Sequence, residues 1–563
     1  MNTVIPIAVE GSSKQRKRQA PKGRQVDRDA LDQVQALLGD ASRQADLLIE
    51  HLHKIQDRYG CLSAMHLAAL AQEMRMPQAQ VYEVATFYHH FDVVKEGESA
   101  PPALTVRVCA GLSCEMAGAQ ALLARLPAIL GKEVRVIEAP CIGRCEQAPA
   151  AVVGQKSVPY ANAEAIGAAV KAGDIHEVPG DYTNYDGYRA GGGYALLRDC
   201  IEGRRDAESL IAALEDSGLR GLGGAGFPAG RKWRIVRAEA GPRLMAVNID
   251  EGEPGTFKDR VYLERDPHRF IEGALIAAWA VGIDTIYIYL RDEYHGCRAI
   301  LETELDKLRA TPPVPALPRL ILRRGAGAYI CGEESAMIES IEGKRGMPRL
   351  RPPYVAQVGL FGRPTLEHNF ETLHWVRDIV EQGAAAFGAH GRNGRKGLRS
   401  FSVSGRVREP GVKLAPAGIT IRELIDEYCG GMQDGQAFYG YLPGGASGGI
   451  LPASMGDIPL DFDTLQPYGC FIGSAAVVVL SDRDSAAAAA RSTMRFFRDE
   501  SCGQCTPCRV GTAKALALIA QPKWDTALLA ELSQVMRDAS ICGLGQAAPN
   551  PIDCVVKYFP NEL

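Results

Sequence analysis

Three features are scarce in this sequence of 563 residues: an excess of one charge, long apolar runs and a secretory signal. Its 63 basic and 67 acidic residues give a net charge of -4, without the broad cationic field that attracts nucleic acid. The longest apolar runs, at residues 273–283 and 470–480, have about half of the roughly 20 residues that a membrane-spanning helix needs. We therefore expect no nucleic-acid binding and no membrane span, and no secretion either.

Cysteine, by contrast, is plentiful, with 15 residues. Such a number indicates disulfides in a short secreted chain, but tightly spaced cysteines in a long chain without a signal peptide more often hold metal. We therefore expect a reducing, cytoplasmic location. The length predicts about four domains, since domains have roughly 150 residues each.

The N-terminal part of the chain reads as a tail followed by helices. Residues 1–42 begin with clustered lysines and arginines and little that could be buried, which predicts a disordered basic tail. Apolar residues recur at helical spacing in residues 43–100, which predicts a small helical domain. His89 and His90 end this unit, and we favour packing or surface roles for them over metal binding, because adjacent side chains on a helix point in different directions.

Residues 101–178 alternate between strand and helix patterns and predict a compact α/β domain. The expected strands are 104–108, 134–137 and 150–153, and the expected helix is 116–130. Two cysteine pairs follow strands, Cys109 with Cys114 and Cys141 with Cys145. Four thiolates can converge on one metal centre, and we favour an iron-sulfur cluster over zinc because zinc sites more often use C-x2-C pairs.

A glycine-rich stretch at residues 220–232 ends in two cations and contains the G-x-G-x-x-G spacing that receives a pyrophosphate. Two further stretches, 248–260 and 325–334, combine glycines with polar side chains, so the three predict one nucleotide-sized pocket in an α/β domain of residues 195–398. The glycine loop follows a helical pattern at 207–216 instead of a strand, which argues against an ordinary dinucleotide fold. The expected strands are 245–248 and 285–290, and the expected helix is 269–281.

The last two segments differ in pattern. Residues 399–484 predict a small β-rich domain, and residues 485–563 predict a helical domain with helices at 486–498, 510–519 and 524–537. Cys502, Cys505 and Cys508 lie within seven residues, and Cys542 follows much later. Zinc sites usually divide their cysteines two and two, so this spacing favours a [4Fe-4S] cluster.

The combination of a dinucleotide pocket with two iron-sulfur clusters implies a further cofactor that links their electron chemistry. Nicotinamide exchanges a hydride, which carries two electrons, whereas a cluster exchanges one electron at a time. A flavin converts between the two, so these parts imply a flavin. Hydride transfer needs stacking and orientation of the two rings, and we expect no covalent catalytic residue.

Several motifs resemble known families. Residues 85–91 and the two cysteine pairs resemble the thioredoxin-like [2Fe-2S] subunit of NADH dehydrogenases, which implies a two-iron cluster on Cys109, Cys114, Cys141 and Cys145. Residues 195–560 resemble the FMN-bearing, NADH-binding subunit of complex I and its soluble relatives. That resemblance implies a Rossmann-like flavin domain, a ubiquitin-like domain at 399–484 and a helical bundle with a [4Fe-4S] cluster.

The resemblance also implies particular contacts. Phe227 is expected to flank the adenine of NAD(H), and Glu334 to bond its nicotinamide end. Arg351 and Tyr354 depart from the lysine and phenylalanine that are usual in complex I. The residues implied in binding FMN and NAD(H) are Gly221, Gly223, Gly224, Gly226, Phe227, Lys232, Asn248, Asp250, Glu251, Tyr329, Gly332, Glu333, Glu334 and Asn369.

The fusion of the two-iron and flavin units in one chain resembles the beta subunit of soluble, molybdenum- or tungsten-dependent NAD formate dehydrogenases. The resemblance implies that formate is oxidised in an iron-sulfur-rich partner subunit and that electrons pass through the clusters to FMN and NAD+. One alternative is the diaphorase subunit of a soluble NAD-reducing hydrogenase, which is expected to lack the complete two-iron ligand set. Others are NADH:quinone oxidoreductase, where the units are usually separate chains, and a non-redox zinc and nucleotide scaffold.

Overall fold

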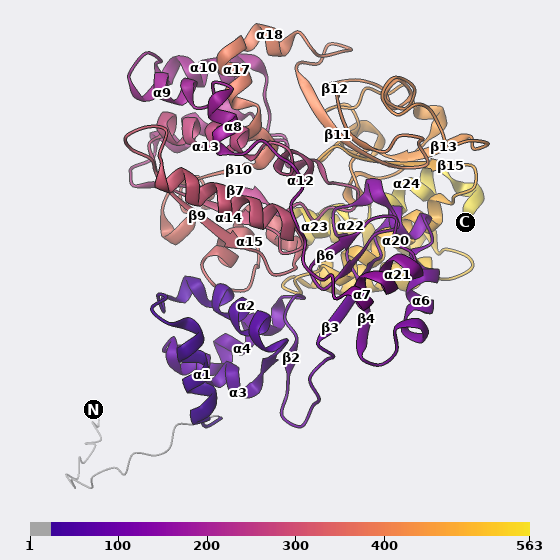
Figure 1. The fold of residues 1–563 in the computed structure, drawn as a ribbon. Coiled ribbons are helices and arrows are strands. Elements are labelled where there is room, and N and C mark those ends of the chain that lie inside the picture. Colours follow the sequence, from indigo (N-terminus) through magenta and orange to yellow (C-terminus); the bar gives the residue numbers. More distant parts are fainter. Residues whose placement is uncertain (1–23) are drawn as a thin grey trace, which may run out of the picture.

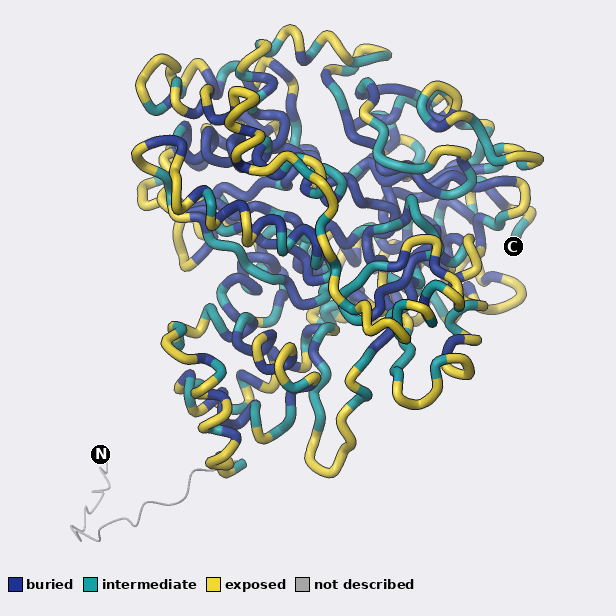
Figure 2. The backbone as a smooth tube through the Cα atoms, viewed as in Figure 1, coloured by how far each residue is buried: buried dark blue, intermediate teal, exposed yellow. Residues whose placement is uncertain are grey.

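The computed structural model describes residues 24–563, so the first part of the predicted basic tail, residues 1–23, lies outside the described residues. Figure 1 shows the N-terminal helices below a mixed α/β part, with further strands and the C-terminal helices beside it. Buried residues run through the interior of these parts, and exposed residues mark the outer turns (Figure 2). None of the helices in the described part of the chain has the length and apolar character needed to cross a bilayer.

The predicted disordered tail is wrong over its last part, because Arg28–Leu38 form helix α1. The helix begins after Asp27, whose carboxylate accepts a hydrogen bond from Ala30 N at 2.9 Å. Ala30, Val34 and Leu38 recur every four residues on one face and are buried. This apolar face packs on the N-terminal helical unit, which also contains α2 (Leu48–Tyr59), α3 (Ala64–Glu73) and α4 (Gln78–Phe87).

The N-terminal helical unit also contacts the edge of a sheet. Helix α2 packs against strand β9 (Arg319–Arg324), and Glu50 on this helix accepts a hydrogen bond from the Arg324 backbone N at 3.1 Å. Arg323 on the same strand pairs with Asp46 at 2.7 Å. Polar contacts therefore link the N-terminal unit to a strand more than 250 positions further along the chain.

The next unit is a four-stranded sheet in the order β4-β3-β5-β6, in which β3 and β4 are parallel and β6 is Lys156–Val158. The three predicted strands are confirmed as β3 (Leu104–Cys109), β4 (Val134–Ala139) and β5 (Ala151–Val153). The single helix predicted at 116–130 is wrong in one respect, because α5 (Leu112–Met116) ends before α6 (Ala119–Leu130) begins. Gly118 between them has a φ of 90°, a left-handed conformation that interrupts a helix.

A parallel sheet in the order β10-β7-β8-β9 forms the centre of the third unit. Strands β7 (Arg243–Ile249) and β8 (Ile283–Leu290) confirm the two predicted strands, and their apolar runs are continuous because helices cover both faces. Helices α13 (Pro267–Val281) and α14 (His295–Ala310) contact each other through His268 and Glu304, 2.9 Å apart, and α15 (Glu334–Ile341) packs on β7. The fourth strand is β10 (Thr365–Asn369).

The glycine-rich loop stands between two helices, as its sequence context predicts. Helix α10 (Ala207–Ser217) precedes the loop and α11 (Ala229–Ala238) follows it. Other helices of this unit are α8 (Tyr185–Ala190), α9 (Ala195–Ile201), α12 (Lys258–Leu263), α16 (Phe370–His374), α17 (Val376–Gln382) and α18 (Ala384–Gly388). The loop therefore lacks the strand-turn-helix setting of an ordinary dinucleotide fold.

A five-stranded sheet follows, in the order β12-β11-β15-β13-β14. Its central strands β11 (Leu398–Gly405) and β15 (Ala476–Ser481) are parallel, and its other pairs are antiparallel. The remaining strands are β12 (Gly411–Pro416), β13 (Phe438–Leu442) and β14 (Leu451–Pro452). The short helix α19 (Ile421–Glu423) continues into a π-helical turn at Leu424–Tyr428.

The C-terminal part is helical. The predicted helices are confirmed as α20 (Ala486–Asp499), α21 (Thr506–Ile519) and α22 (Thr526–Ala539). Two further helices, α23 (Gly543–Ala547) and α24 (Asn550–Tyr558), follow. Helix α24 packs on α20 and returns the chain to the preceding sheet, so these helices close one side of the molecule.

Candidate flavin cavity and cluster sites

A cavity of about 590 Å³ opens at the carboxyl ends of the adjacent parallel strands β7 and β10. This edge of a parallel sheet is the usual place for a ligand in α/β folds. Nine of the fourteen residues predicted to bind FMN or NAD(H) line it: Gly223, Gly224, Asn248, Asp250, Glu251, Tyr329, Gly332, Glu333 and Asn369. Three stretches distant in the sequence therefore converge on one cavity.

The remaining predicted residues, Gly221, Gly226, Phe227, Lys232 and Glu334, do not line the cavity. Gly223 in the same loop faces Asn369 closely, because a Cβ at residue 223 would lie 2.9 Å from the Cβ of Asn369. Only glycine allows this approach. Phe227 is 41% exposed, so its ring is accessible to a ligand from solvent.

Lys232 belongs to a group of opposite charges beside the cavity. Its Nζ lies 2.9 Å from Glu367 and 3.7 Å from Glu334. Burial by itself lowers the pKa of Lys232, but Glu367 and Glu334 outweigh it and the pKa is raised. Arg351 pairs with Glu333 and lies 3.1 Å from Glu334. Lys232 therefore keeps its positive charge, and Lys232 and Arg351 are both paired with carboxylates at this edge.

Glu251 is held by the start of α12. Its carboxylate accepts hydrogen bonds from the backbone N of Asp259 at 2.9 Å and of Arg260 at 3.1 Å. The Tyr294 hydroxyl donates a third bond at 2.8 Å. Burial, reinforced by the charge of Asp259, raises the pKa of Glu251 to about 7. This carboxyl group therefore changes its protonation near neutral pH.

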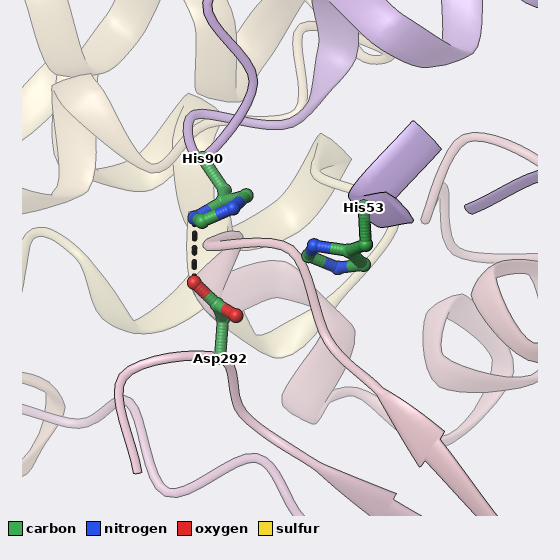
Figure 3. Close-up of side chains that lie close together, drawn as sticks. All are labelled: His53, His90 and Asp292. Carbon is green, nitrogen blue, oxygen red and sulfur yellow. Dashed lines mark ion pairs between the residues drawn. The ribbon is translucent and has the colours of Figure 1, made fainter. Parts of the chain in front are cut away.

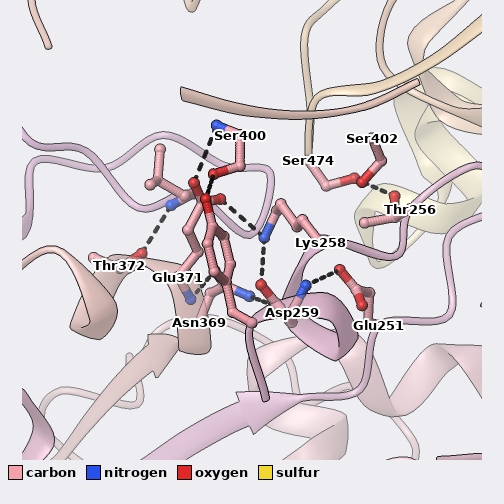
Figure 4. Close-up of polar contacts among 12 residues, drawn as sticks. Glu251, Thr256, Lys258, Asp259, Asn369, Glu371, Thr372, Ser400, Ser402 and Ser474 are labelled. Atoms are coloured by element: carbon pink, nitrogen blue, oxygen red, sulfur yellow. Dashed lines mark hydrogen bonds and ion pairs between the residues drawn. The ribbon is translucent and has the colours of Figure 1, made fainter. Parts of the chain in front are cut away.

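A buried lysine, which the sequence interpretation did not single out, lies in the same wall. Lys258 Nζ contacts Asp259 at 2.7 Å and Glu371 at 3.1 Å, as Figure 4 shows. Asn369 Nδ2 donates to the second oxygen of Asp259 at 2.7 Å. Burial favours the neutral amine, but the two carboxylates outweigh it and raise the pKa of Lys258. Lys258 thus remains a cation beside the cavity, paired with two anions.

One buried acceptor in the wall has no partner. Asp250 Oδ2 is buried and makes no hydrogen bond with any described residue, and burial raises the pKa of this carboxyl well above its ordinary value. A buried polar atom without a partner is costly, so the site favours a ligand that supplies a donor. The ribityl hydroxyls of FMN are such donors. This part of the wall therefore fits a hydroxylated ligand.

The four cysteines of the N-terminal quartet come together beside this cavity. Cys109 ends β3, Cys114 lies in α5, and Cys141 and Cys145 flank the turn after β4. All four are buried, and the Sγ atoms of Cys141 and Cys145 lie 3.3 Å apart. A Cβ at Gly111 would lie 3.5 Å from the Cys109 sulfur and 3.6 Å from the Cys141 sulfur, so glycine makes room between them.

The C-terminal quartet also converges. Cys502, Cys505, Cys508 and Cys542 line one small cavity together with Ile330 and Leu544. Cys505 precedes α21 and Cys508 lies in its first turn, while Cys542 precedes α23. Burial raises the pKa of the Cys508 thiol to about 11 and that of the Cys542 thiol to about 12.

The spread of both quartets argues against a single ion. Among residues 24–563, the group with three or more ligand atoms all within 4.8 Å of one another is His53, His90 and Asp292, and it contains no cysteine. A tetrahedral zinc ion with bonds of roughly 2.3 Å would bring its four sulfurs to within about 4 Å of one another. The quartets are therefore spaced for clusters of several irons, which fit these donors.

The cluster sites and the flavin cavity share walls. Ile330 and Leu544 line both the large cavity and the cavity of the C-terminal cysteines. Asp250 and Tyr329 line both the large cavity and a small space that reaches Cys141. A single layer of residues thus separates the cavity from each quartet, which is the arrangement that electron transfer between them requires.

Two arginines that the sequence interpretation missed join the two-iron loop to the cavity. Arg260 Nε donates to the Gly143 carbonyl at 2.9 Å, and Arg291 Nη2 donates to the Cys141 carbonyl at 2.7 Å. The second guanidinium also donates to the Glu251 carbonyl. Both arginines are buried. Arg260 lies in one of the polar stretches noted in the sequence, but Arg291 carries no local signal.

The cavity and the two quartets define an iron-sulfur flavoprotein that exchanges electrons with NAD(H), and comparison with known families agrees. Residues 214–378 match the Nuo51 FMN-binding domain family, and residues 34–173 match the thioredoxin-like [2Fe-2S] ferredoxin family. Residues 488–563 match the iron-sulfur binding region of NADH-ubiquinone oxidoreductase-F. The predicted cofactors, FMN, NAD(H), [2Fe-2S] and [4Fe-4S], are confirmed.

The chain belongs to the family of the F-type flavoprotein subunits of NADH-quinone oxidoreductase. It is 41% identical over 390 residues to the NADH-quinone oxidoreductase F 2 subunit of Rhizobium meliloti, covering 67% of this chain and 92% of that protein. It is 38% identical over 405 residues to the mitochondrial NADH dehydrogenase [ubiquinone] flavoprotein 1 of Dictyostelium discoideum, covering 68% and 84%. A chain of NAD+-reducing [NiFe]-hydrogenase in the H2-reduced state is similar with a TM-score of 0.82 and 32% identity, over 92% of this chain and 93% of that one.

Proposed function

We propose that this chain is the diaphorase subunit of a multi-subunit oxidoreductase, in which it exchanges electrons between NAD(H) and a partner subunit. The observation that carries the proposal is the shared wall: Ile330 and Leu544 separate the cavity from the four-iron site, and Tyr329 separates it from the two-iron loop. Bound FMN would supply the conversion between a hydride and single electrons. Its site would be the cavity at the ends of β7 and β10.

The side chains of this chain would position the reactants. The Gly223 backbone leaves room next to Asn369, and Asp250 offers an acceptor to a ligand hydroxyl. Lys232 and Lys258 supply positive charge on two sides of the cavity. Phe227 and Glu334 are the proposed contacts of NAD(H), at the accessible edge of the site. We assign the protein orientation and electrostatics, since nothing in this chemistry demands a nucleophile.

For the partner, the hydrogenase type has the stronger support. The similarity to the hydrogenase chain extends over 92% of this chain, whereas the similarity to the NADH-quinone oxidoreductase F 2 subunit covers 67% of it. We therefore propose an iron-sulfur-rich catalytic partner of the kind found in a NAD-reducing hydrogenase, in a cytoplasmic complex.

A molybdenum- or tungsten-dependent formate dehydrogenase is the second candidate. The observation that favours it is the complete two-iron quartet, Cys109, Cys114, Cys141 and Cys145, together with the fusion of both units in one chain. In that case formate oxidation in the partner would deliver the electrons for NAD+ reduction. The names of the similar proteins above do not mention formate, so this donor stays a prediction.

One experiment tests the diaphorase assignment. The anaerobically purified chain is expected to contain FMN and six irons and to pass electrons from NADH to ferricyanide. Cys505→Ser should leave flavin reduction by NADH intact while blocking transfer to the partner, because the change removes one ligand of the four-iron site. A colourless, zinc-containing preparation without NADH oxidation would refute the assignment.

A second experiment identifies the donor. The complex that copurifies with the natural chain should be assayed for NAD+ reduction with H2 and with formate, and its metals should be determined. Nickel and H2-dependent NADH formation would establish the hydrogenase type, and molybdenum or tungsten with formate-dependent NADH formation would establish the other. A complex that uses neither donor would contradict both candidates and leave the NADH:quinone oxidoreductase type.

A further inference from the structure

Three side chains of types that bind metal ions lie close together where the N-terminal helical unit contacts the flavin domain. His53 lies in α2, His90 follows α4, and Asp292 follows β8. One ligand atom from each lies within 4.8 Å of the other two. Figure 3 shows the His53 ring turned toward the ring of His90 and the Asp292 carboxylate. None of the three side chains lines the flavin cavity or the cavity of the C-terminal quartet.

Each histidine has one ring nitrogen engaged and one without a partner. His53 Nε2 lies 2.8 Å from the Gly325 carbonyl, and a carbonyl only accepts, so this nitrogen carries the proton. The neutral ring then presents a lone pair at Nδ1. His90 Nδ1 lies 2.5 Å from Asp292, which leaves Nε2 free. His53 Nδ1 and His90 Nε2 are both buried and neither has a hydrogen-bond partner among the described residues.

The two histidine rings lie close together. Their centroids are 4.8 Å apart, the ring planes are inclined by 48°, and His53 Nδ1 and His90 Nε2 have no hydrogen-bond partner among residues 24–563. Neutral imidazole nitrogens are the commonest protein ligands of zinc, and a carboxylate completes many such sites. A hydrogen bond from the other ring nitrogen to a carbonyl or carboxylate, as His53 makes to Gly325, is the usual support of a metal-binding histidine.

Charged groups of both signs surround the site. Arg324 Nε donates to Asp292 Oδ1 at 2.5 Å, and the same guanidinium pairs with Asp57 at 2.7 Å. Arg107 and Arg298 add positive charge and the buried Glu50 adds a carboxylate.

We propose that one ring nitrogen each of His53 and His90 and an oxygen of Asp292, which lie within 4.8 Å of one another, bind one divalent transition-metal ion, Zn2+ above all, which replaces the proton between His90 and Asp292 and fastens the N-terminal helical unit to the flavin domain. His295 is the candidate for a fourth ligand, because it follows Asp292 by three residues and its buried Nδ1 has no partner among residues 24–563. The ion would take no part in electron transfer, since zinc has no redox chemistry.

The test uses the full, FMN-loaded chain, incubated with ZnCl2 and then freed of loose metal with EDTA and gel filtration. We expect one zinc per FMN by mass spectrometry. Zinc K-edge absorption should show nitrogen and oxygen ligands at roughly 2.0–2.1 Å and no sulfur at about 2.3 Å, which distinguishes this site from zinc in a cysteine quartet. Less than a tenth of a zinc per FMN, or a sulfur ligand, would overturn the proposal.

Variants locate the site. His53→Gln and His90→Gln should each lower the zinc content at least tenfold at unchanged FMN and iron content. His51→Gln is the matched control, because His51 is also buried in α2 and bonds a backbone carbonyl, that of Ser42, at 2.8 Å. Should either variant fail to retain FMN, Asp292→Asn replaces it. Zinc retained in these variants, or lost equally in the His51 variant, would refute the assignment.

Discussion

Lys258 is the side chain that balances the buried charges of the cavity wall, since Asp259 and Glu371 both lie within 3.1 Å of it. Removing one partner of a buried ion pair leaves an uncompensated charge, at a cost of about 3–5 kcal/mol. We therefore expect Lys258→Met to lose most of its FMN and to unfold at lower urea concentration. FMN content and the urea midpoint of the purified variant check this.

The control for Lys258 is Lys344, an exposed lysine that also pairs with two carboxylates, Glu339 and Glu342. Exposed pairs contribute only about 0–1 kcal/mol, so Lys344→Met should behave as the unaltered protein does. Equal stability and FMN content in the two variants would contradict the role of Lys258.

Glu251 gives the cavity a dependence on pH. Because its pKa rises to about 7, the folded protein keeps a proton that the unfolded chain releases near pH 4.5, and stability falls as the pH rises toward and through 7. Between pH 6 and pH 8 this loss amounts to roughly 1.4 kcal/mol. In Glu251→Gln the loss should be absent, which urea unfolding of both proteins at the two pH values measures. A difference between the proteins that does not change with pH would refute the prediction.

The sequence identifies site residues whose partners are close in the sequence, or whose side-chain type is itself a recognisable ligand. Three of the C-terminal quartet lie within seven positions, and thiolates are recognisable iron ligands. Lys258 lies inside a stretch already noted as polar, yet its role depends on Glu371, far along the chain. Arg291 has no local pattern, because its function arises only when two domains meet. The sequence alone therefore does not predict which residues make contacts between domains.

At the scale of elements, the turn after β4 presses against the flavin domain at one glycine. Gly143 has a φ of 72°, and a Cβ there would lie 2.3 Å from the Tyr294 hydroxyl oxygen. That hydroxyl donates to Glu251, so the turn also supports the cavity wall. Gly143→Ala must therefore displace the turn or the ring. We expect a loss of about 1–3 kcal/mol and an altered two-iron EPR signal beside an unchanged four-iron signal.

The matched control is Gly167→Ala in helix α7 (Ala163–Ala172), where a Cβ meets nothing within 4 Å. Alanine at such a position leaves stability unchanged or raises it by about 0.4–1 kcal/mol. If the Gly143 variant matched this control in stability and in both EPR signals, the close contact with Tyr294 would have no energetic importance.

Sequence patterns predict the helices and strands correctly where nearly all residues of the element are buried. The continuous apolar runs of β7 and β8 predict buried parallel strands, and both are present. Helix α1 shows the opposite case, because the basic residues around it favoured disorder while three apolar residues on one face were enough for packing. The break between α5 and α6 depends on the left-handed conformation of Gly118. The residues on both sides of it have helical periodicity, so the sequence pattern does not indicate the break.

At the scale of the whole molecule, three parts of the chain build the cavity. The flavin domain supplies the strand ends, the five-stranded sheet region supplies Ser447 and Ser474, and the C-terminal helices supply Leu544 and Asn550. A ligand at 100 times its dissociation constant stabilises the folded state by roughly 2.7 kcal/mol. Removing FMN should therefore increase hydrogen exchange in residues 444–449 and 543–550 as well as in 248–260. Changes confined to 248–260 would argue against a shared binding site.

The contact between α2 and β9 has a consequence for how the chain could be divided. Strand β9 ends its sheet, and an uncovered strand edge offers backbone groups to any other strand, which promotes aggregation. Residues 24–100 shield that border, where Glu50 of α2 accepts a hydrogen bond from the Arg324 backbone N–H. A shortened protein beginning at residue 101 would keep every cysteine of both quartets. It would still be prone to self-association, because α2 would no longer cover the edge of strand β9.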